Sequence, residues 1–185
     1  HPLLDTVKPS MSKDEAYSFF GLQQEKKTVL FMPGSRVQEV QSLYGKMLAA
    51  GKLLQDKVEG LQFMVPKAST IDRHMLEEAA REANLEVHIG EERVYDMMNI
   101  ADAAICASGT ATLETALMGV PTLLVYRVNA LTYWLSKILV HLDSIGLPNI
   151  ISGHRIMPEL WQDEVTPENI EAAVLPWLVD AAASE

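Results

Sequence analysis

Residues 102–114 read D-A-A-I-C-A-S-G-T-A-T-L-E, an apolar run followed at once by small hydroxyl residues, a glycine and a glutamate. The run at 103–106 has the length and the apolar character of a buried β-strand. The residues after Gly109 suit the beginning of a helix. This passage from an apolar strand into a helix decides the fold, because the same passage recurs along the chain.

Other apolar runs of strand length lie at 28–32, 61–65, 86–89 and 122–126. Helix-length segments at 12–20, 37–54, 71–84 and 166–179 surround or separate them. In the second of these segments, Val40, Leu43, Met47 and Leu54 fall on one side at helical spacing. Such alternation predicts an α/β fold, a Rossmann-like parallel sheet with helices on both faces. We expect one domain over residues 1–185.

The composition excludes several classes of protein. A net charge of −10 argues against nonspecific binding to nucleic acid. Cys106 is the single cysteine, so an internal disulfide and a cysteine zinc site are excluded. The sequence has no D-x-D pair, no metal-ligand spacing of histidines, no G-x-G-x-x-G and no phosphate-binding G-K-[S/T] loop. We therefore expect neither a metal nor a cofactor.

The location follows from what the sequence lacks. No run of 18 apolar residues and no signal peptide is visible, so a cytoplasmic protein is expected. The chain begins H-P-L-L-D, without a methionine. This beginning indicates a processed product or a fragment whose earlier half is absent.

In parallel α/β sheets, ligands bind beyond the carboxyl ends of the strands, which directs attention to the loops there. The first strand leads into M-P-G-S-R at 32–36. Gly34 permits a tight turn, Ser35 can cap the following helix, and Arg36 adds a forked cation. These features suit a phosphate cradle at a helix N-terminus. An ordinary capped helix with a solvated arginine explains the same residues.

The opening stretch offers a second such loop. Gly109 allows the backbone to approach a ligand, and Ser108, Thr110 and Thr112 can donate hydrogen bonds to phosphate oxygens. Glu114 offers acceptors only, which suits the two hydroxyls of a ribose. The alternative is a helix N-terminus with an acidic first turn. Two such loops on nearby strands favour a nucleotide site.

Three further features of the sequence each allow more than one interpretation. Gly90 could let main-chain groups face a flat base, and the amides of Asn149 and Gln162 could serve a sugar or phosphate, or fasten a loop. The apolar and aromatic stretch at 126–140 predicts a buried or partner-facing helix. The alternative for this stretch is contact with a membrane surface through Tyr133, Trp134 and Lys137.

Four segments together resemble the carboxy-terminal half of lipid-A-disaccharide synthases. They are L-F-M-P-G-S-R-V-Q-E-V, I-C-A-S-G-T-A-T-L-E, G-L-P-N-I-I and P-E-L-W-Q, in this order. The opening H-P-L-L-D resembles the segment that links the two halves, so residues 1–10 are interpreted as a linker remnant. The resemblance covers essentially the whole chain.

The resemblance implies one half of a two-domain GT-B glycosyltransferase. In this family, the carboxy-terminal half binds UDP-2,3-diacylglucosamine. The amino-terminal half holds the acceptor, 2,3-diacylglucosamine 1-phosphate, whose hydroxyl displaces UDP with inversion and without a metal. The general base is expected in the amino-terminal acceptor domain, which this chain lacks. The fragment alone is therefore expected to be inactive.

The resemblance also implies roles for particular residues. Arg36 would steady the diphosphate and the charge that develops on the leaving UDP. The remaining expected UDP-binding residues are Ser35, Gly90, Ser108, Gly109, Thr110, Thr112, Glu114, Asn149 and Gln162. The resemblance also allows two further interactions. One is a homodimer, and the other is peripheral contact with the cytoplasmic face of the inner membrane.

Two alternatives remain at this point. One is the donor half of another GT-B enzyme, such as a peptidoglycan-precursor transferase or a UDP-N-acetylglucosamine epimerase. The other is a non-catalytic nucleotide-sugar-binding subunit. The M-P-G-S-R and L-P-N-I segments tilt against the first alternative.

Overall fold

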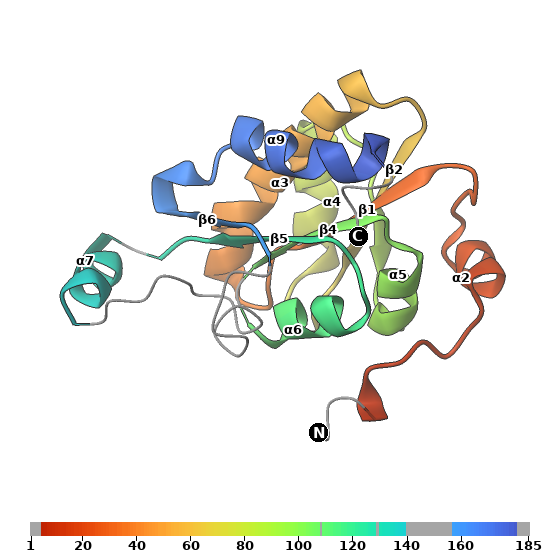
Figure 1. Ribbon diagram of the computed structural model, residues 1–185, viewed down its shortest axis with the longest axis horizontal. Helices are drawn as coiled ribbons and strands as arrows, with labels where there is room; N and C mark the ends of the chain where they lie inside the picture. The colour runs from red at the N-terminus through yellow and green to blue at the C-terminus, as the bar shows by residue number, and fades with distance from the viewer. Residues whose placement is uncertain (1–4, 108, 129, 140–156, 181–185) are drawn as a thin grey trace.

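A computed structural model describes residues 5–107, 109–128, 130–139 and 157–180. Its centre is a six-stranded sheet in the order β3-β2-β1-β4-β5-β6, with neighbouring strands parallel (Figure 1). The strands are β1 (Lys27–Met32), β2 (Leu61–Pro66), β3 (His88–Gly90), β4 (Ala103–Ala107), β5 (Thr122–Tyr126) and β6 (Glu159–Trp161). The predicted parallel α/β fold is confirmed.

Helices cover both faces of this sheet (Figure 1). One face carries α3 (Val37–Lys57), α4 (Arg73–Glu82) and α9 (Pro167–Val179), and the other carries α2 (Lys13–Phe20), α5 (Val94–Ile100) and α6 (Thr110–Leu117). A short 3-10 helix, η1 (Gln162–Glu164), follows β6, and α7 (Ala130–Leu139) stands apart from the body of the domain.

Apolar burial on the two faces holds these layers together. From Thr28 to Phe31 the residues of β1 are fully buried, and Phe31 stacks on Phe63 of β2 at 5.4 Å between ring centroids. The four residues predicted to share one side of α3, Val40, Leu43, Met47 and Leu54, are all buried in the core on that face. Burial of this kind contributes roughly 25 cal/mol per Å² of apolar surface.

Cys106 behaves as expected for a core residue. It is fully buried in β4, and burial raises the pKa of its thiol to about 12. The thiol is therefore protonated at neutral pH and is a poor nucleophile.

Among the elements that the structure describes, the strand β6, the 3-10 helix η1 and the helix α5 were not predicted from the sequence. β6 has three residues, Glu159–Trp161, too few to show a strand period. α5 begins after Arg93, which has left-handed backbone angles (φ 61°) and makes no side-chain cap. By contrast, α2 opens with the Ser12–Glu15 capping box that a sequence pattern can reveal.

The segment ahead of α2 is fastened to α5 by a buried carboxylate. Asp96 accepts hydrogen bonds from the backbone N–H groups of Ser10 and Met11, both at 2.8 Å, and from the Ser10 hydroxyl at 2.7 Å. Burial alone would raise the pKa of Asp96, but these hydrogen bonds outweigh it, so the pKa lies below its ordinary value. Asp96 is therefore ionised at neutral pH and fixes the direction from which the chain enters the domain.

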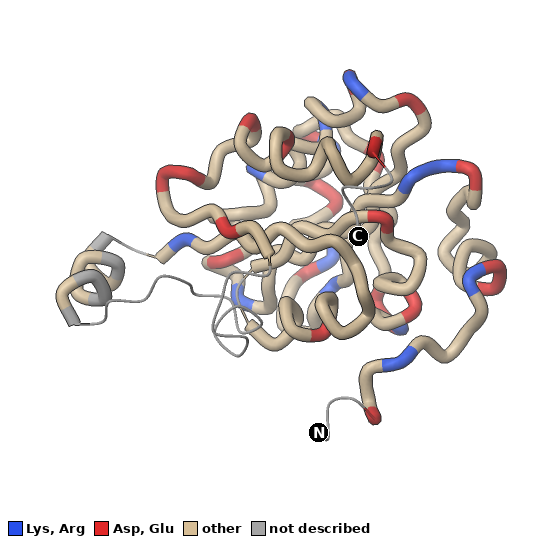
Figure 2. The backbone as a smooth tube through the Cα atoms, in the orientation of Figure 1, with Lys and Arg blue, Asp and Glu red and all other residues tan. Residues whose placement is uncertain are grey.

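The strand order places a topological switch between β1 and β4. The chain passes from β1 outward to β2 and β3, and then returns to place β4 on the other side of β1. The register pairs Met32 with Cys106, so the turns that leave β1 and β4 begin side by side. Such a switch point is where open α/β sheets bind ligands. Basic and acidic residues are interspersed along the trace around it (Figure 2).

Candidate functional site

A cavity of about 670 Å³ opens at this carboxyl edge of the sheet. Turns after β1, β2, β3 and β4, together with Tyr126 at the end of β5, form its wall. Its size falls in the range that suits a small-molecule ligand. Five of the residues expected to bind UDP line it: Ser35, Arg36, Gly90, Gly109 and Thr110.

The turn after β1 presents a helix N-terminus to this cavity. Gly34 has φ 107°, a backbone conformation that residues with a side chain rarely adopt, and a β-carbon here would also force the Glu39 carboxylate to move. Arg36 is the residue that precedes α3, and its carbonyl accepts the first helical hydrogen bond from Val40 at 3.0 Å. The Arg36 side chain is exposed, and no hydrogen bond or ion pair of its guanidinium is found within the described residues. The first-turn N–H groups and this cation suit an anionic ligand.

The turn after β4 presents a second helix N-terminus. Gly109 has φ 136° and ψ −163°, angles that essentially only glycine adopts, and α6 begins at the next residue, Thr110. Thr112, which was expected to contact phosphate, does not face the cavity. It is fully buried, and its hydroxyl donates to the Ala107 carbonyl at 2.9 Å. Ser108, the remaining residue expected in the cradle, lies outside the described residues.

Glu114 lies one turn into α6, is partly buried, and does not itself line the cavity. Its carboxylate accepts a hydrogen bond from the Tyr95 hydroxyl of α5 at 2.9 Å. Burial, and then this carboxylate, raise the pKa of Tyr95, so the phenol stays protonated and remains a donor. A carboxylate has about four acceptor positions, so the tyrosine orients Glu114 and leaves acceptors for a ligand.

The two amides expected near the ligand have different outcomes. Gln162 fastens a loop, because its Nε2 donates to the Val128 carbonyl at 3.0 Å and its Oε1 accepts from the Val128 N–H at 2.7 Å. Both ends of the amide are thus engaged with the backbone, as in the loop-fastening alternative. Asn149 lies outside the described residues.

Gly90 lies against a side chain of α5. A β-carbon there would lie 2.8 Å from the sulfur of Met97, so a larger residue would force the buried Met97 side chain to shift. The Gly90 carbonyl accepts a hydrogen bond from the Lys67 N–H at 2.7 Å, which joins the ends of β2 and β3. The backbone at Gly90 therefore forms part of the cavity surface directly.

Several charged residues that line the cavity were not expected there from the sequence. The cations are Lys67 and Arg93, and the acids are Glu39, Glu91 and Glu92. Lys67 lies two residues after the predicted strand at 61–65, so its position just beyond an apolar run was the available signal. Arg93 donates to the Ser10 hydroxyl at 2.9 Å and lies 5.3 Å from the ring centre of Phe19, contacts between distant segments that no local pattern reveals.

A metal site is not formed by the residues that the structure describes, since no group of three or more histidine, cysteine, aspartate or glutamate side chains gathers among them. The wall instead combines two helix N-termini, cations and a glycine backbone. These features can bind a phosphorylated ligand without a metal.

Comparison with known proteins gives a consistent result. Residues 1–184 match the family model described as lipid-A-disaccharide synthetase. The chain is 43% identical over its full length to the lipid-A-disaccharide synthase of Geobacter metallireducens and covers 48% of that protein. It therefore spans about half the length of this curated relative.

Solved structures share the fold at low identity. A UDP-N-acetylglucosamine 2-epimerase homologue of Listeria monocytogenes matches with a TM-score of 0.63 and 16% identity, over 98% of this chain and 43% of that one. The E. coli ADP-heptose lipopolysaccharide heptosyltransferase II matches with a TM-score of 0.60 and 14% identity, over 95% of this chain and 54% of that one. These likenesses show the α/β Rossmann-like fold and nothing finer.

Proposed function

The chain belongs to the lipid-A-disaccharide synthetase family, and we propose that it is the carboxy-terminal, donor-binding domain of a lipid-A-disaccharide synthase. The donor is UDP-2,3-diacylglucosamine, and the cavity at the carboxyl edge holds its UDP moiety. Family membership favours this function over another GT-B transferase, an epimerase or a non-catalytic subunit.

One observation carries the proposal. Two helix N-termini, at Arg36 and at Gly109, come from the adjacent strands β1 and β4 and line the same cavity. Each offers unpaired backbone N–H groups and a positive dipole end. A diphosphate carries an anionic group for each, and a single phosphate does not. This geometry accordingly favours a nucleoside diphosphate.

The proposed division of labour follows from the site. Arg36 stabilises the charge that develops on UDP as the glycosidic bond to the diphosphate breaks, a role in which one donor can contribute about 3–4 kcal/mol. Thr110 and the backbone at Gly109 hold the phosphates. Glu114, oriented by Tyr95, accepts hydrogen bonds from the ribose hydroxyls.

The acceptor, 2,3-diacylglucosamine 1-phosphate, and the general base that deprotonates its hydroxyl belong in this proposal to an amino-terminal domain. Residues 1–10 are the linker to that domain, and Asp96 holds the end of this linker against α5. The 185-residue chain alone is expected to bind donor without transferring the sugar. A transfer rate above background with both lipid substrates would contradict this expectation.

The diacylated substrates of this proposal place the protein at a membrane surface. On α7 the side chains of Leu131, Trp134, Leu135 and Ile138 are exposed, at spacings that form one apolar stripe. This stripe suits the boundary between lipid headgroups and acyl chains. Within the described residues, no helix has both the length and the apolar character needed to cross a bilayer.

Calorimetric titration with UDP, ADP and GDP, without added metal, tests the donor site. UDP is expected to bind more tightly than the other two, and Glu114→Ala is expected to weaken UDP binding by about 1.5–3 kcal/mol, as for loss of a charged hydrogen bond. Tyr95→Phe is the graded control, because it removes the orienting hydroxyl and keeps the carboxylate. Equal binding of all three nucleotides, or an unchanged affinity in Glu114→Ala, would contradict the assignment.

A further inference from the structure

The loop between β2 and α4 forms a second basic part of the cavity wall. Three contacts shape it: the Lys67 N–H donates to the Gly90 carbonyl at 2.7 Å, the Ile71 N–H donates to the Ala68 carbonyl at 3.0 Å, and the Thr70 hydroxyl donates to the Ser35 carbonyl. The last contact fastens the loop to the turn that precedes α3. Lys67 is thereby held in the same wall as that turn.

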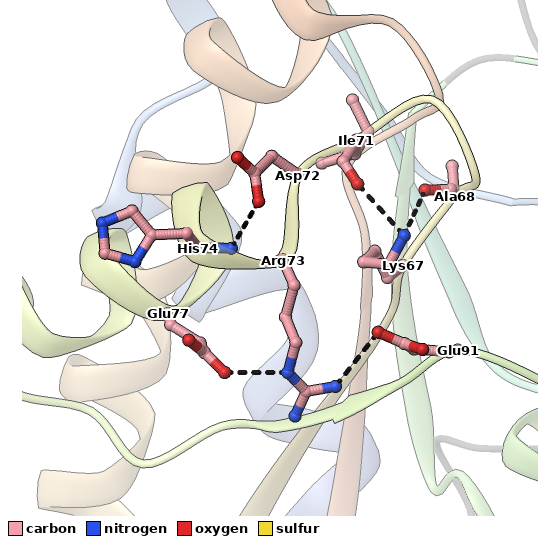
Figure 3. Close-up of polar contacts among 8 residues, drawn as sticks. All are labelled: Lys67, Ala68, Ile71, Asp72, Arg73, His74, Glu77 and Glu91. Carbon is pink, nitrogen blue, oxygen red and sulfur yellow. Dashed lines mark hydrogen bonds and ion pairs between the residues drawn. The ribbon is translucent and has the colours of Figure 1, made fainter.

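Lys67 carries a charge that its surroundings do not neutralise. Its Nζ donates to the carbonyl oxygens of Ala68 at 3.3 Å and Ile71 at 3.1 Å (Figure 3). An ammonium group has three N–H donors, so these two neutral acceptors leave one unused. No carboxylate of the described part of the chain lies within ion-pair distance of this Nζ.

The neighbouring cation shows the contrast. Arg73 donates to Glu77 at 2.8 Å and to Glu91 at 3.4 Å (Figure 3). Glu91, which follows β3, lines the cavity, and its carboxylate pairs with Arg73 of α4. No such pair with Lys67 is found within the described residues.

We propose that Lys67 binds a phosphoryl group of the ligand through its remaining N–H donor. The proposal rests on the proposed function and deepens it, because it adds a residue that discriminates charged from uncharged ligands. The phosphoryl group has two sources in that function: the diphosphate of the UDP donor and the phosphate of the acceptor. Lys67 shares the cavity wall with Arg36, which favours the diphosphate.

The test compares ligands of different charge on the 185-residue chain. The affinities of UDP, uridine and glucosamine 1-phosphate are measured for the parent chain, Lys67→Met and Lys67→Arg. Lys67→Met is expected to weaken UDP binding about tenfold, the effect of one charged hydrogen bond, and to leave uridine binding nearly unchanged. Lys67→Arg keeps the charge and is expected to retain most of the affinity. A loss confined to glucosamine 1-phosphate would assign the lysine to the acceptor phosphate.

Lys52→Met is the matched control, because the Lys52 Nζ also donates to a backbone carbonyl, that of Asn84 at 3.0 Å, away from the cavity. It is expected to leave all three affinities unchanged. Equal losses of UDP and uridine in Lys67→Met would show only a distorted loop and overturn the proposal, as would no loss for either phosphorylated ligand. Absence of UDP binding in the parent chain would instead contradict the proposed function itself.

Discussion

Thr110 and Thr112 each carry a hydroxyl group in the first turn of α6, but the two side chains have different surroundings. The Thr110 side chain is exposed and lines the cavity. Thr112 is buried, and its hydroxyl donates to the carbonyl at the end of β4. One threonine can therefore contact a ligand, while the other joins the strand to the helix that follows it.

Replacement of each threonine by valine should separate these roles. Thr112→Val is expected to lower the free energy of unfolding by about 1–3 kcal/mol, because the buried Ala107 carbonyl loses its donor, and to leave UDP affinity unchanged. Thr110→Val is expected to weaken UDP binding with little effect on stability. Denaturant unfolding and calorimetry on the two variants measure both quantities. A fall in UDP affinity for Thr112→Val at unchanged stability would return Thr112 to the phosphate cradle.

At the scale of elements, the beginning of α6 depends on a backbone conformation that one residue type allows. Gly109 has φ 136°, and nothing within 4 Å would obstruct a β-carbon there. A side chain at this position would therefore be disfavoured by the backbone alone and not by a clash. Gly45 in α3 also has open space around it, with no such unusual φ.

Replacement of Gly109 and of Gly45 by alanine is expected to change the stability of the chain in opposite directions. Gly109→Ala is expected to destabilise the chain by about 1–3 kcal/mol and to displace the N-terminus of α6 from the cavity. Gly45→Ala is expected to stabilise it by about 0.5–1 kcal/mol, because alanine is the better helix former. Thermal unfolding of both variants decides the signs. Equal effects of the two substitutions would mean that the turn tolerates a side chain and does not aim the helix.

The elements also show what a sequence can and cannot disclose. The strands β1, β2, β4 and β5 were predictable because buried parallel strands are continuous apolar runs. β6 and α5 were not, because a strand of three residues and a helix of seven are too short to show a period. The glycines of the two turns were predictable from their place after strands.

Other parts of the site depend on contacts between distant segments. Lys67 enters the wall because β2 lies beside β1 in the sheet, and Tyr95 reaches Glu114 from another helix. Thr112 and Gln162 were expected at a ligand because threonine and glutamine can donate to one. The structure instead engages Thr112 with the Ala107 carbonyl and Gln162 with the Val128 backbone. A sequence gives the donors and acceptors of a side chain but not which partner satisfies them.

At the scale of the whole molecule, the acidic chain places three cations beside three carboxylates at one edge of its sheet. The net charge is −10, yet Arg36, Lys67 and Arg93 line the cavity at the carboxyl ends of the strands. Charges beyond a Debye length of about 8 Å are largely screened at physiological salt. The local groups therefore decide whether an anionic ligand binds, and the overall charge opposes nonspecific polyanions.

We propose that both helix N-termini at this edge contact one bound UDP molecule. Backbone amide chemical shifts, followed by NMR during a titration with UDP, test this. The predicted result is that the amides at 34–36, at 109–111 and at Gly90 shift most and saturate together with a single dissociation constant. Shifts confined to one of the two turns, shifts centred away from the cavity, or none at millimolar UDP would contradict the claim.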